Sequence, residues 1–242
     1  MLFIVMHKIN EDTAPAGPPD PELMKGMHEL VGGAISSGKM HDGDGLLGSK
    51  SRVRLQWKGG ERAVAKGPYK GSNELVASFL KLKVDTMDEA VQWASRFGEA
   101  VQASELEVGQ ITEMWDLGIA PRPEGHVPLR VLVLHKADKN SEAGTPRAPE
   151  AQKKVSALVD EMKTAGVLLG YESLTPSSKA SRLQRVAGKN TWTDGPFAES
   201  KELISGYIIL KLDSKQEAID WATRYATILG DVEVDVREVV AS

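Results

Sequence analysis

The stretch Val5-Met6-His7-Lys8 returns 128 residues later as Val133-Leu134-His135-Lys136. The same spacing separates four further pairs: Pro21-Glu22 and Pro149-Glu150, Arg54-Leu55-Gln56 and Arg182-Leu183-Gln184, Gly67-Pro68-Tyr69 and Gly195-Pro196-Phe197, Trp93-Ala94 and Trp221-Ala222. From Val5 to Arg96 the two copies align without a gap, and 29 of the 92 positions are identical. A repeat of this length predicts that the chain consists of two copies of one folding unit.

The duplication also sets the predicted domain boundaries. Residues 1–116 form the first copy and residues 129–242 form the second. Residues 117–128 join them and have the composition of a linker, with Pro121, Pro123, Gly125 and Pro128. A chain of 242 residues has room for two such domains.

The first part of each copy is predicted to be a strand followed by a helix. Residues 2–8 and 130–136 are short apolar runs, which are typical of central strands. Apolar residues at helical spacing follow in both copies. Gly38 ends the predicted helix of the first copy and Gly166 that of the second, because glycine readily adopts the conformation that stops a helix.

The second part of each copy is predicted to be a hairpin, a long strand, a helix and a final strand. Gly59-Gly60 and Ala187-Gly188 are two-residue hairpin turns, and the long strands cover residues 75–84 and 203–212. A hydroxyl residue followed three positions later by Glu predicts a capped helix start in both copies, at Thr86 with Glu89 and at Ser214 with Glu217. The last strand alternates between valines and charged residues from 232 to 237.

This order of elements predicts an α+β fold with antiparallel sheets and helices on one sheet face. The other face of each sheet also needs cover. The equivalent face of the other copy is the simplest partner, so we expect a pseudo-dimer within one chain, with a cavity between the sheets. Phe79 and Tyr207, at matched positions of the long strands, are expected to line that cavity and to bind a ligand.

Composition excludes several classes of function. The net charge of −4 leaves no basic excess for nucleic acid, and no apolar run is long enough for a membrane helix. The absence of cysteine excludes thiolate chemistry and fits a cytoplasmic location. No metal-ligand motif is present, so neither a metal nor a cofactor is expected. Gly43-Asp44-Gly45-Leu46-Leu47-Gly48 spells a dinucleotide motif, but a strand-like segment follows it instead of a helix.

Three stretches of the second copy are distinctive: residues 193–202 read TDGPFAESKE, residues 136–144 read KADKNSEAG, and residues 165–169 read AGVLL. Through these stretches the second copy resembles the DGPF-type branch of the YCII-related domain family. The resemblance implies a ferredoxin-like domain that pairs into a dimeric α/β barrel. A few relatives are thought to use a His–Asp pair for acid–base chemistry, but the first strands of this chain end in His7-Lys8 and His135-Lys136, without Asp.

His135 and Asp194 are the candidate catalytic residues, and each has a simpler interpretation. An imidazole at a strand end can act as a general base near neutral pH, or it can be a partly solvated surface group; His7 shares both interpretations and is a candidate ligand contact. Asp194 can be a polar group at a cavity mouth or simply the first residue of a turn. Lys66 occupies the matching position of the first copy and is a candidate contact for an anionic ligand.

Two hypotheses of function therefore remain open. In the first, the protein binds a small organic molecule between its halves and catalyses an elimination or isomerisation with His135 and Asp194. In the second, it is a non-catalytic regulatory or interaction module whose interior is filled with side chains. A cavity of at least about 300 Å³ between the sheets would favour the first hypothesis. The sequence leaves the choice between a monomer and a homodimer in solution open.

Overall fold

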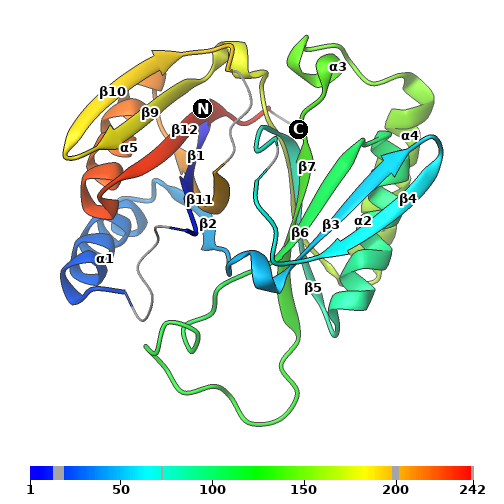
Figure 1. The fold of residues 1–242 in the computed structure, drawn as a ribbon, viewed down its shortest axis with the longest axis horizontal. Coiled ribbons are helices and arrows are strands. Elements are labelled where there is room, and N and C mark those ends of the chain that lie inside the picture. Colours follow the sequence, from blue (N-terminus) through cyan, green and yellow to red (C-terminus); the bar gives the residue numbers. More distant parts are fainter. Residues whose placement is uncertain (13–18, 72, 198–201, 241–242) are drawn as a thin grey trace.

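A computed structural model describes residues 1–12, 19–71, 73–197 and 202–240. The strands and helices of these residues follow in chain order (Figure 1): β1 (Leu2–Ile9), α1 (Pro21–Ser36), β2 (Met40–Gly45), β3 (Arg52–Lys58), β4 (Glu61–Lys66), β5 (Val76–Val84), α2 (Met87–Val101), β6 (Glu105–Gln110), β7 (Leu129–Lys136), α3 (Lys139–Glu142), α4 (Pro149–Thr164), β8 (Leu168–Ser173), β9 (Ser181–Val186), β10 (Lys189–Asp194), β11 (Leu203–Lys211), α5 (Lys215–Leu229) and β12 (Val232–Glu238).

The strands form two antiparallel six-stranded sheets, in the orders β10-β9-β12-β1-β11-β2 and β4-β3-β6-β7-β5-β8. We name them the first-strand sheet and the linker sheet, because β1 lies in the former and the linker joins β6 to β7 in the latter. The chain thus has the predicted α+β fold with antiparallel sheets, consistent with two tandem ferredoxin-like domains.

Each sheet is built from both sequence copies. The segment β1-α1-β2 belongs to the first copy, but its strands pair with β12 and β11 of the second copy. In the same way, β7 and β8 of the second copy pair with β6 and β5 of the first. The two copies have therefore exchanged their first strand-helix-strand segments. As a result, each sheet with its covering helices contains residues of both sequence copies.

The helices cover the outer faces of the sheets, and the inner faces meet (Figure 1). Helices α1 and α5 pack on the first-strand sheet, and α2 and α4 pack on the linker sheet. Between the sheets lies a third apolar cluster with side chains from β1, β5, β7 and β11. Burial of each large apolar side chain contributes about 1.5–3 kcal/mol, so this cluster holds the two sheets together.

Side-chain alternation decides which residues face the helices. In β7, Leu132 and Leu134 join the cluster between the sheets, whereas Val131 and Val133 join the core under α2 and α4. His135 continues the second set and therefore faces the helices. The predicted alternation of β12 is also confirmed, with its valines in the core under α5 and its charged side chains turned the other way.

Local sequence signals explain where the elements begin and end. Thr86 Oγ1 accepts a hydrogen bond from the Glu89 amide at 3.1 Å, and Ser214 Oγ accepts one from the Glu217 amide at 3.2 Å. These contacts confirm the two predicted helix caps. Gly59 and Gly60 both have positive φ, as the predicted two-residue hairpin turn requires.

Two strands were not predicted. β2 and β8 lie at the edges of the sheets, where each pairs with one neighbour only. They contain no β-branched residue, and β2 carries two glycines, so their composition gave little sign of a strand. Gly43 and Gly45 lie within β2, and the motif leads through a single 3-10 turn, Ser49–Ser51, into β3, so it does not open an α-helix. No described helix has the length and apolar character needed to cross a membrane.

Candidate functional site

The imidazole of His135 lies between the linker sheet and helix α2. Only 5% of the residue is exposed. Its Nδ1 is 3.1 Å from Ser78 Oγ of β5, and its ring meets the Phe97 ring of α2 edge to face, with 6.3 Å between centroids. Because β7 belongs to the second copy while Ser78 and Phe97 belong to the first, this site is composed of both sequence copies.

The surroundings of His135 keep its imidazole neutral. Burial and, to a smaller extent, the positive charge of Arg147 lower the pKa of this group from its usual 6.5 to about 4, whereas Asp138 opposes them. Ser78 Oγ can accept a hydrogen bond from Nδ1–H, and no described residue forms a hydrogen bond with Nε2. A neutral imidazole with a free Nε2 can accept a proton or a hydrogen bond.

Polar side chains from β8 and from the loop before α4 form the rim of this site. Tyr171 packs its ring against Phe97 with 5.8 Å between centroids, and its hydroxyl is 3.4 Å from Ser173 Oγ. Arg147 donates a hydrogen bond from Nη1 to the Tyr171 hydroxyl at 3.0 Å. These three rim residues are half-buried, so the rim reaches the protein surface.

His7 occupies the matching place on the first-strand sheet. Its Nδ1 is 2.8 Å from the hydroxyl of Tyr225 in α5. Burial, together with the charge of Arg52, lowers the pKa of His7 to about 4. Tyr225 matches Phe97 in the repeat, so the hydroxyl partner of the imidazole comes from the helix here and from the strand at His135.

Asp194 and His135 belong to different sheets. Asp194 ends β10, the edge strand of the first-strand sheet, whereas His135 belongs to the linker sheet. The Asp194 carboxylate accepts a hydrogen bond from Ser181 Oγ and lies 3.6 Å from Lys215 Nζ, and the Ser181 contact lowers its pKa most. The structure does not bring these two candidates together. Lys66 ends the exposed edge strand β4 of the other sheet.

Phe79 and Tyr207 lie between the sheets, as expected, but they fill the space there. Their rings are 5.1 Å apart, and the two residues are 1% and 2% exposed. The expected cavity is replaced at this point by the apolar cluster of β1, β5, β7 and β11. Close packing of large side chains from both faces accounts for the difference. A role for these two rings in ligand binding stays a prediction.

Tyr207 differs from Phe79 by a hydroxyl that enters a polar cluster between the sheets. This hydroxyl donates to Asp42 Oδ2 at 2.7 Å, and burial together with the Asp42 charge raises the pKa of Tyr207. Lys81 Nζ lies 2.6 Å from Asp42 and 2.7 Å from Asp44, and Arg130 pairs with Asp44 at 2.8 Å. The cluster ties β2 and β11 to β5 and β7 across the interface of the sheets.

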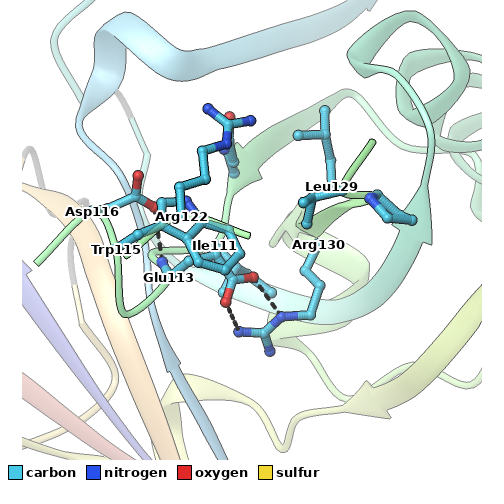
Figure 2. A pocket seen from close by; sticks show the side chains of 10 residues that line it. Ile111, Glu113, Trp115, Asp116, Arg122, Leu129 and Arg130 are labelled. Atoms are coloured by element: carbon cyan, nitrogen blue, oxygen red, sulfur yellow. Dashed lines mark hydrogen bonds and ion pairs between the residues drawn. The ribbon is translucent and has the colours of Figure 1, made fainter. Parts of the chain in front are cut away.

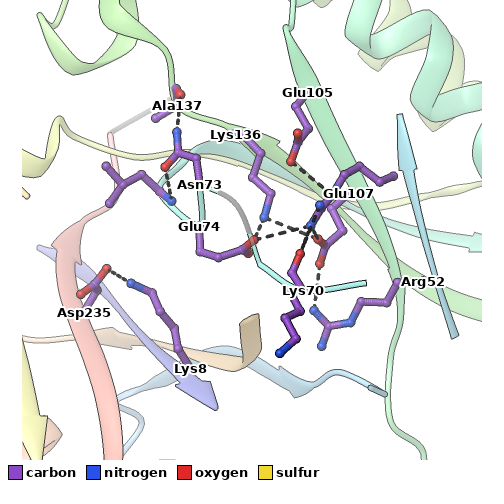
Figure 3. Close-up of polar contacts among 12 residues, drawn as sticks. Lys8, Arg52, Lys70, Asn73, Glu74, Glu105, Glu107, Lys136, Ala137 and Asp235 are labelled. Atoms are coloured by element: carbon purple, nitrogen blue, oxygen red, sulfur yellow. Dashed lines mark hydrogen bonds and ion pairs between the residues drawn. The ribbon is translucent and has the colours of Figure 1, made fainter. Parts of the chain in front are cut away.

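A buried charge network lies on the inner face of the linker sheet (Figure 3). Lys136 lies between the carboxylates of Glu74 and Glu107, and Arg52 holds the other oxygen of Glu107 at 2.8 Å. Burial raises the pKa of Glu107, but the charges of Lys136 and Arg52 outweigh this effect and bring it to about 2. Arg54 lies 3.4 Å from Glu107.

The first-strand sheet carries a matching network. Lys8 Nζ is 2.9 Å from Glu233 and 2.6 Å from Asp235, and Arg182 pairs with Asp235 at 2.6 Å. Burial opposes ionisation of Asp235, but Lys8 and Arg182 keep its pKa below the usual value. Sequence reasoning missed both networks. The signal was present, because Lys8 matches Lys136, Arg182 matches Arg54, and both final strands alternate acidic with apolar residues.

The Gly-Pro-aromatic motif of both copies supports these networks. A Cβ on Gly195 would lie 1.8 Å from the Ser177 carbonyl oxygen, so only glycine fits there. The next ring, Phe197, stacks under the Arg182 guanidinium at 4.2 Å from its centroid, and Tyr69 does the same for Arg54 at 4.0 Å. The motif therefore positions an arginine of each network. Residues 198–201 of the resembling stretch lie outside the described part of the chain.

Two hollows of the described surface lie away from His135. The first is a small polar pocket of about 40 Å³ beside the linker, and Figure 2 shows Glu113 paired there with Arg130. It has room for about one or two water molecules. The second is an open groove of about 460 Å³ between α1 and α5, lined by Leu30, Arg224 and Ile228 among others.

Comparison with known proteins supports the resemblance. The model of the YCII-related domain family matches residues 129–240. An uncharacterised protein of Rhizobium meliloti (strain 1021) is 37% identical over 68 residues, which cover 28% of this chain and 55% of that protein. The chain thus spans about half the length of the curated relative that it matches. Residues 129–240, which contribute His135 and the rim of the site, are a YCII-related domain.

Proposed function

We propose that the protein binds a small organic molecule at His135 and uses this imidazole for acid–base chemistry of the elimination or isomerisation type. One observation carries the proposal: a neutral imidazole is fixed by Ser78 at Nδ1 and keeps Nε2 without a partner among the described residues. In both reactions Nε2 takes a proton from a carbon of the ligand. In an elimination the electrons of that C–H bond form a double bond, and the leaving group departs from the neighbouring carbon with its electron pair. In an isomerisation the same nitrogen returns the proton to another carbon.

The composite nature of the site supports the proposed location. His135 comes from the second copy, and Ser78 and Phe97 come from the first, so the ligand lies between the two sequence halves. The proposed ligand lies on the helix-facing side of the linker sheet, because the space between the two sheets is filled at Phe79 and Tyr207. Since His135 is almost fully buried, ligand entry requires Tyr171 or Arg147 to move aside.

The test uses a fragment library of activated aromatic and carbonyl compounds. Binding is followed through the imidazole resonances of the histidines by NMR, and turnover of each binding fragment is then measured. We expect His135→Gln to lower turnover about 10²- to 10⁴-fold, the usual contribution of a general base. His126→Gln is the matched control, because this imidazole is exposed and pairs with Asp85 at 2.9 Å, away from the His135 site. If no fragment shifts the His135 resonances, the proposal is wrong.

A non-catalytic regulatory or interaction module is the second candidate function. The packed apolar cluster between the sheets favours it, because a filled interior was the expected mark of such a module. Under this candidate, fragments still bind at His135 or at another surface, but none is converted. Ligand binding at His135 that is lost in His135→Gln, without turnover by the wild type, would favour the module over the enzyme.

A further inference from the structure

The rim of the His135 site contains an arginine without a carboxylate partner. Arg147 is half-buried, and no ion pair of the described residues includes it. Its hydrogen bond goes to a neutral group, the Tyr171 hydroxyl at 3.0 Å. By contrast, the buried Arg52, Arg54 and Arg182 all pair with glutamate or aspartate. Partial burial of a guanidinium without an anion is unfavourable, so Arg147 has unused capacity for one.

Arg147 is connected to the imidazole through a short series of contacts. Its partner Tyr171 packs on Phe97, and Phe97 packs on His135. The Tyr171 hydroxyl also meets Ser173, which pairs directly with Ser78 across β8 and β5. All these side chains lie on the helix-facing side of the linker sheet. A molecule that binds Arg147 at the rim and moves the Tyr171 ring aside can therefore approach His135.

The matching place at His7 lacks each of these groups. Arg147 corresponds to Pro19, Tyr171 to Gly43 and Ser173 to Gly45. The N-caps of the neighbouring helices α1 and α4 also differ in charge. Asp20 caps α1 by accepting from the Glu22 amide at 2.7 Å, whereas α4 has Ala148 at this position and no side-chain cap. The second copy has thus gained a positive charge and lost a negative one at this point of the fold.

One acidic group lies near the His135 site and is already occupied. Asp138 Oδ1 accepts hydrogen bonds from the amide and the hydroxyl of Ser141, with distances of 2.8 and 3.0 Å. It caps the short helix α3 in this way and forms no ion pair with Arg147 within 4 Å. Asp138 therefore is not the anionic partner of Arg147.

We infer that the ligand of the His135 site is a small carboxylic acid, whose carboxylate binds the guanidinium of Arg147. This inference rests on the proposed function of the same site. Arginine offers paired N–H donors that match the two oxygens of a carboxylate, and Tyr171 can donate a further hydrogen bond. When its charge is neutralised by the ligand, Arg147 no longer lowers the pKa of His135, so the bound acid makes the imidazole a better base.

The experiment compares two acids with their uncharged amides: benzoate with benzamide, and succinate with succinamide. Binding to the full chain is measured by titration calorimetry and by the imidazole resonances of His135 and His7. We expect saturable binding of at least one acid, at least tenfold tighter than its amide, with shifts at His135 and none at His7. Arg147→Gln should abolish the preference for the acid, and Arg147→Lys should keep part of it.

Arg224→Gln is the matched control, because this exposed arginine lines the groove between α1 and α5. It should bind the acid as the wild type does. A second readout needs no ligand: Arg147→Gln should raise the pKa of His135 in the free protein, whereas the pKa of His7 should stay at about 4, which shows that the variant is folded. The inference is overturned if neither acid binds, or if the acid binds equally well to Arg147→Gln. If uncharged fragments still bind at His135, the proposed function stands and only the carboxylic-acid inference is wrong. If no compound binds at His135, both the inference and the proposed function are wrong.

Discussion

The sites of His7 and His135 share a backbone and differ in their side chains. Both imidazoles are held at Nδ1 by a hydroxyl, and burial lowers the pKa of both to about 4. Around His135, however, Arg147 and Tyr171 form a polar rim, where the other site has proline and glycine. Duplication has kept the support of the imidazole in both copies and has elaborated the surroundings of only one.

The buried charge networks differ in another way: both halves make the same contact, but with arginines at positions that do not match in the repeat. Arg52 donates from Nε to the Leu47 carbonyl at 2.8 Å, and Arg237 donates from Nε to the Thr175 carbonyl at 3.0 Å. The two carbonyls match in the repeat, but the two arginines do not, because they come from β3 and β12. Both halves thus place a buried guanidinium against the matching carbonyl, from β3 in one half and from β12 in the other.

The largest expected effect tests what the two halves share. Lys8→Met and Lys136→Met each remove the ammonium from a buried network, so that the carboxylates outnumber the remaining guanidinium groups. Each change should lower the free energy of unfolding by about 3–5 kcal/mol, measured by urea denaturation. Lys70→Met removes an exposed pair with Asp12 and should leave the midpoint unchanged. Tolerance of either buried substitution would contradict the equivalence of the networks.

A second effect is the pH dependence of stability that both histidines cause. Each imidazole has a pKa of about 4 when folded and about 6.5 when unfolded, so the unfolded chain binds more protons between these values. Stability should therefore fall as the pH drops from 6.5 to 4, by up to about 3 kcal/mol for each histidine. His7→Gln and His135→Gln should each flatten this slope. An unchanged slope in either variant would show that its imidazole is not shielded.

The hydroxyl partners of the two imidazoles provide a smaller test. Ser78→Ala and Tyr225→Phe should each cost about 1 kcal/mol, because each removes one hydrogen bond from a buried ring. Adding Phe97→Tyr to Ser78→Ala copies the arrangement at His7 and should restore most of the loss. Urea denaturation gives the energies, and imidazole nitrogen shifts give the tautomer. If the double variant is no better than Ser78→Ala, the two arrangements are not interchangeable.

The smallest effect is expected at Asp194. Asp194→Asn removes a surface charge near Lys215 at an edge of the first-strand sheet. It should leave the His135 pKa, ligand binding and any turnover as in the wild type, since the two residues belong to different sheets. Loss of turnover in this variant, with binding retained, would restore the predicted pairing of His135 with Asp194.

Much of the fold could be predicted from local patterns. The repeat gave the two copies, helical and alternating spacing gave most elements, and Thr86 and Ser214 marked two helix starts. Edge strands β2 and β8 were missed, because an edge strand is stabilised by its neighbour more than by its own residues. Of the candidate site, the sequence pointed to His7 and His135 but not to Ser78, which is 57 positions from His135 in the chain and adjacent only in space. It did not point to Arg147 either, because the hydrogen bond of Arg147 to Tyr171 joins a loop to an edge strand that was not predicted.

The sequence by itself determined the duplication, the order of elements and the apolar face of each strand, since these follow from residue spacing. Only the tertiary structure decided which sheet β1 and β7 join. The two copies present the same apolar pattern, so exchanged and unexchanged pairing satisfy the same local preferences. That choice also decided which residues surround His135. Ser78 and Phe97 reach the imidazole because β7 pairs with β5 of the other copy.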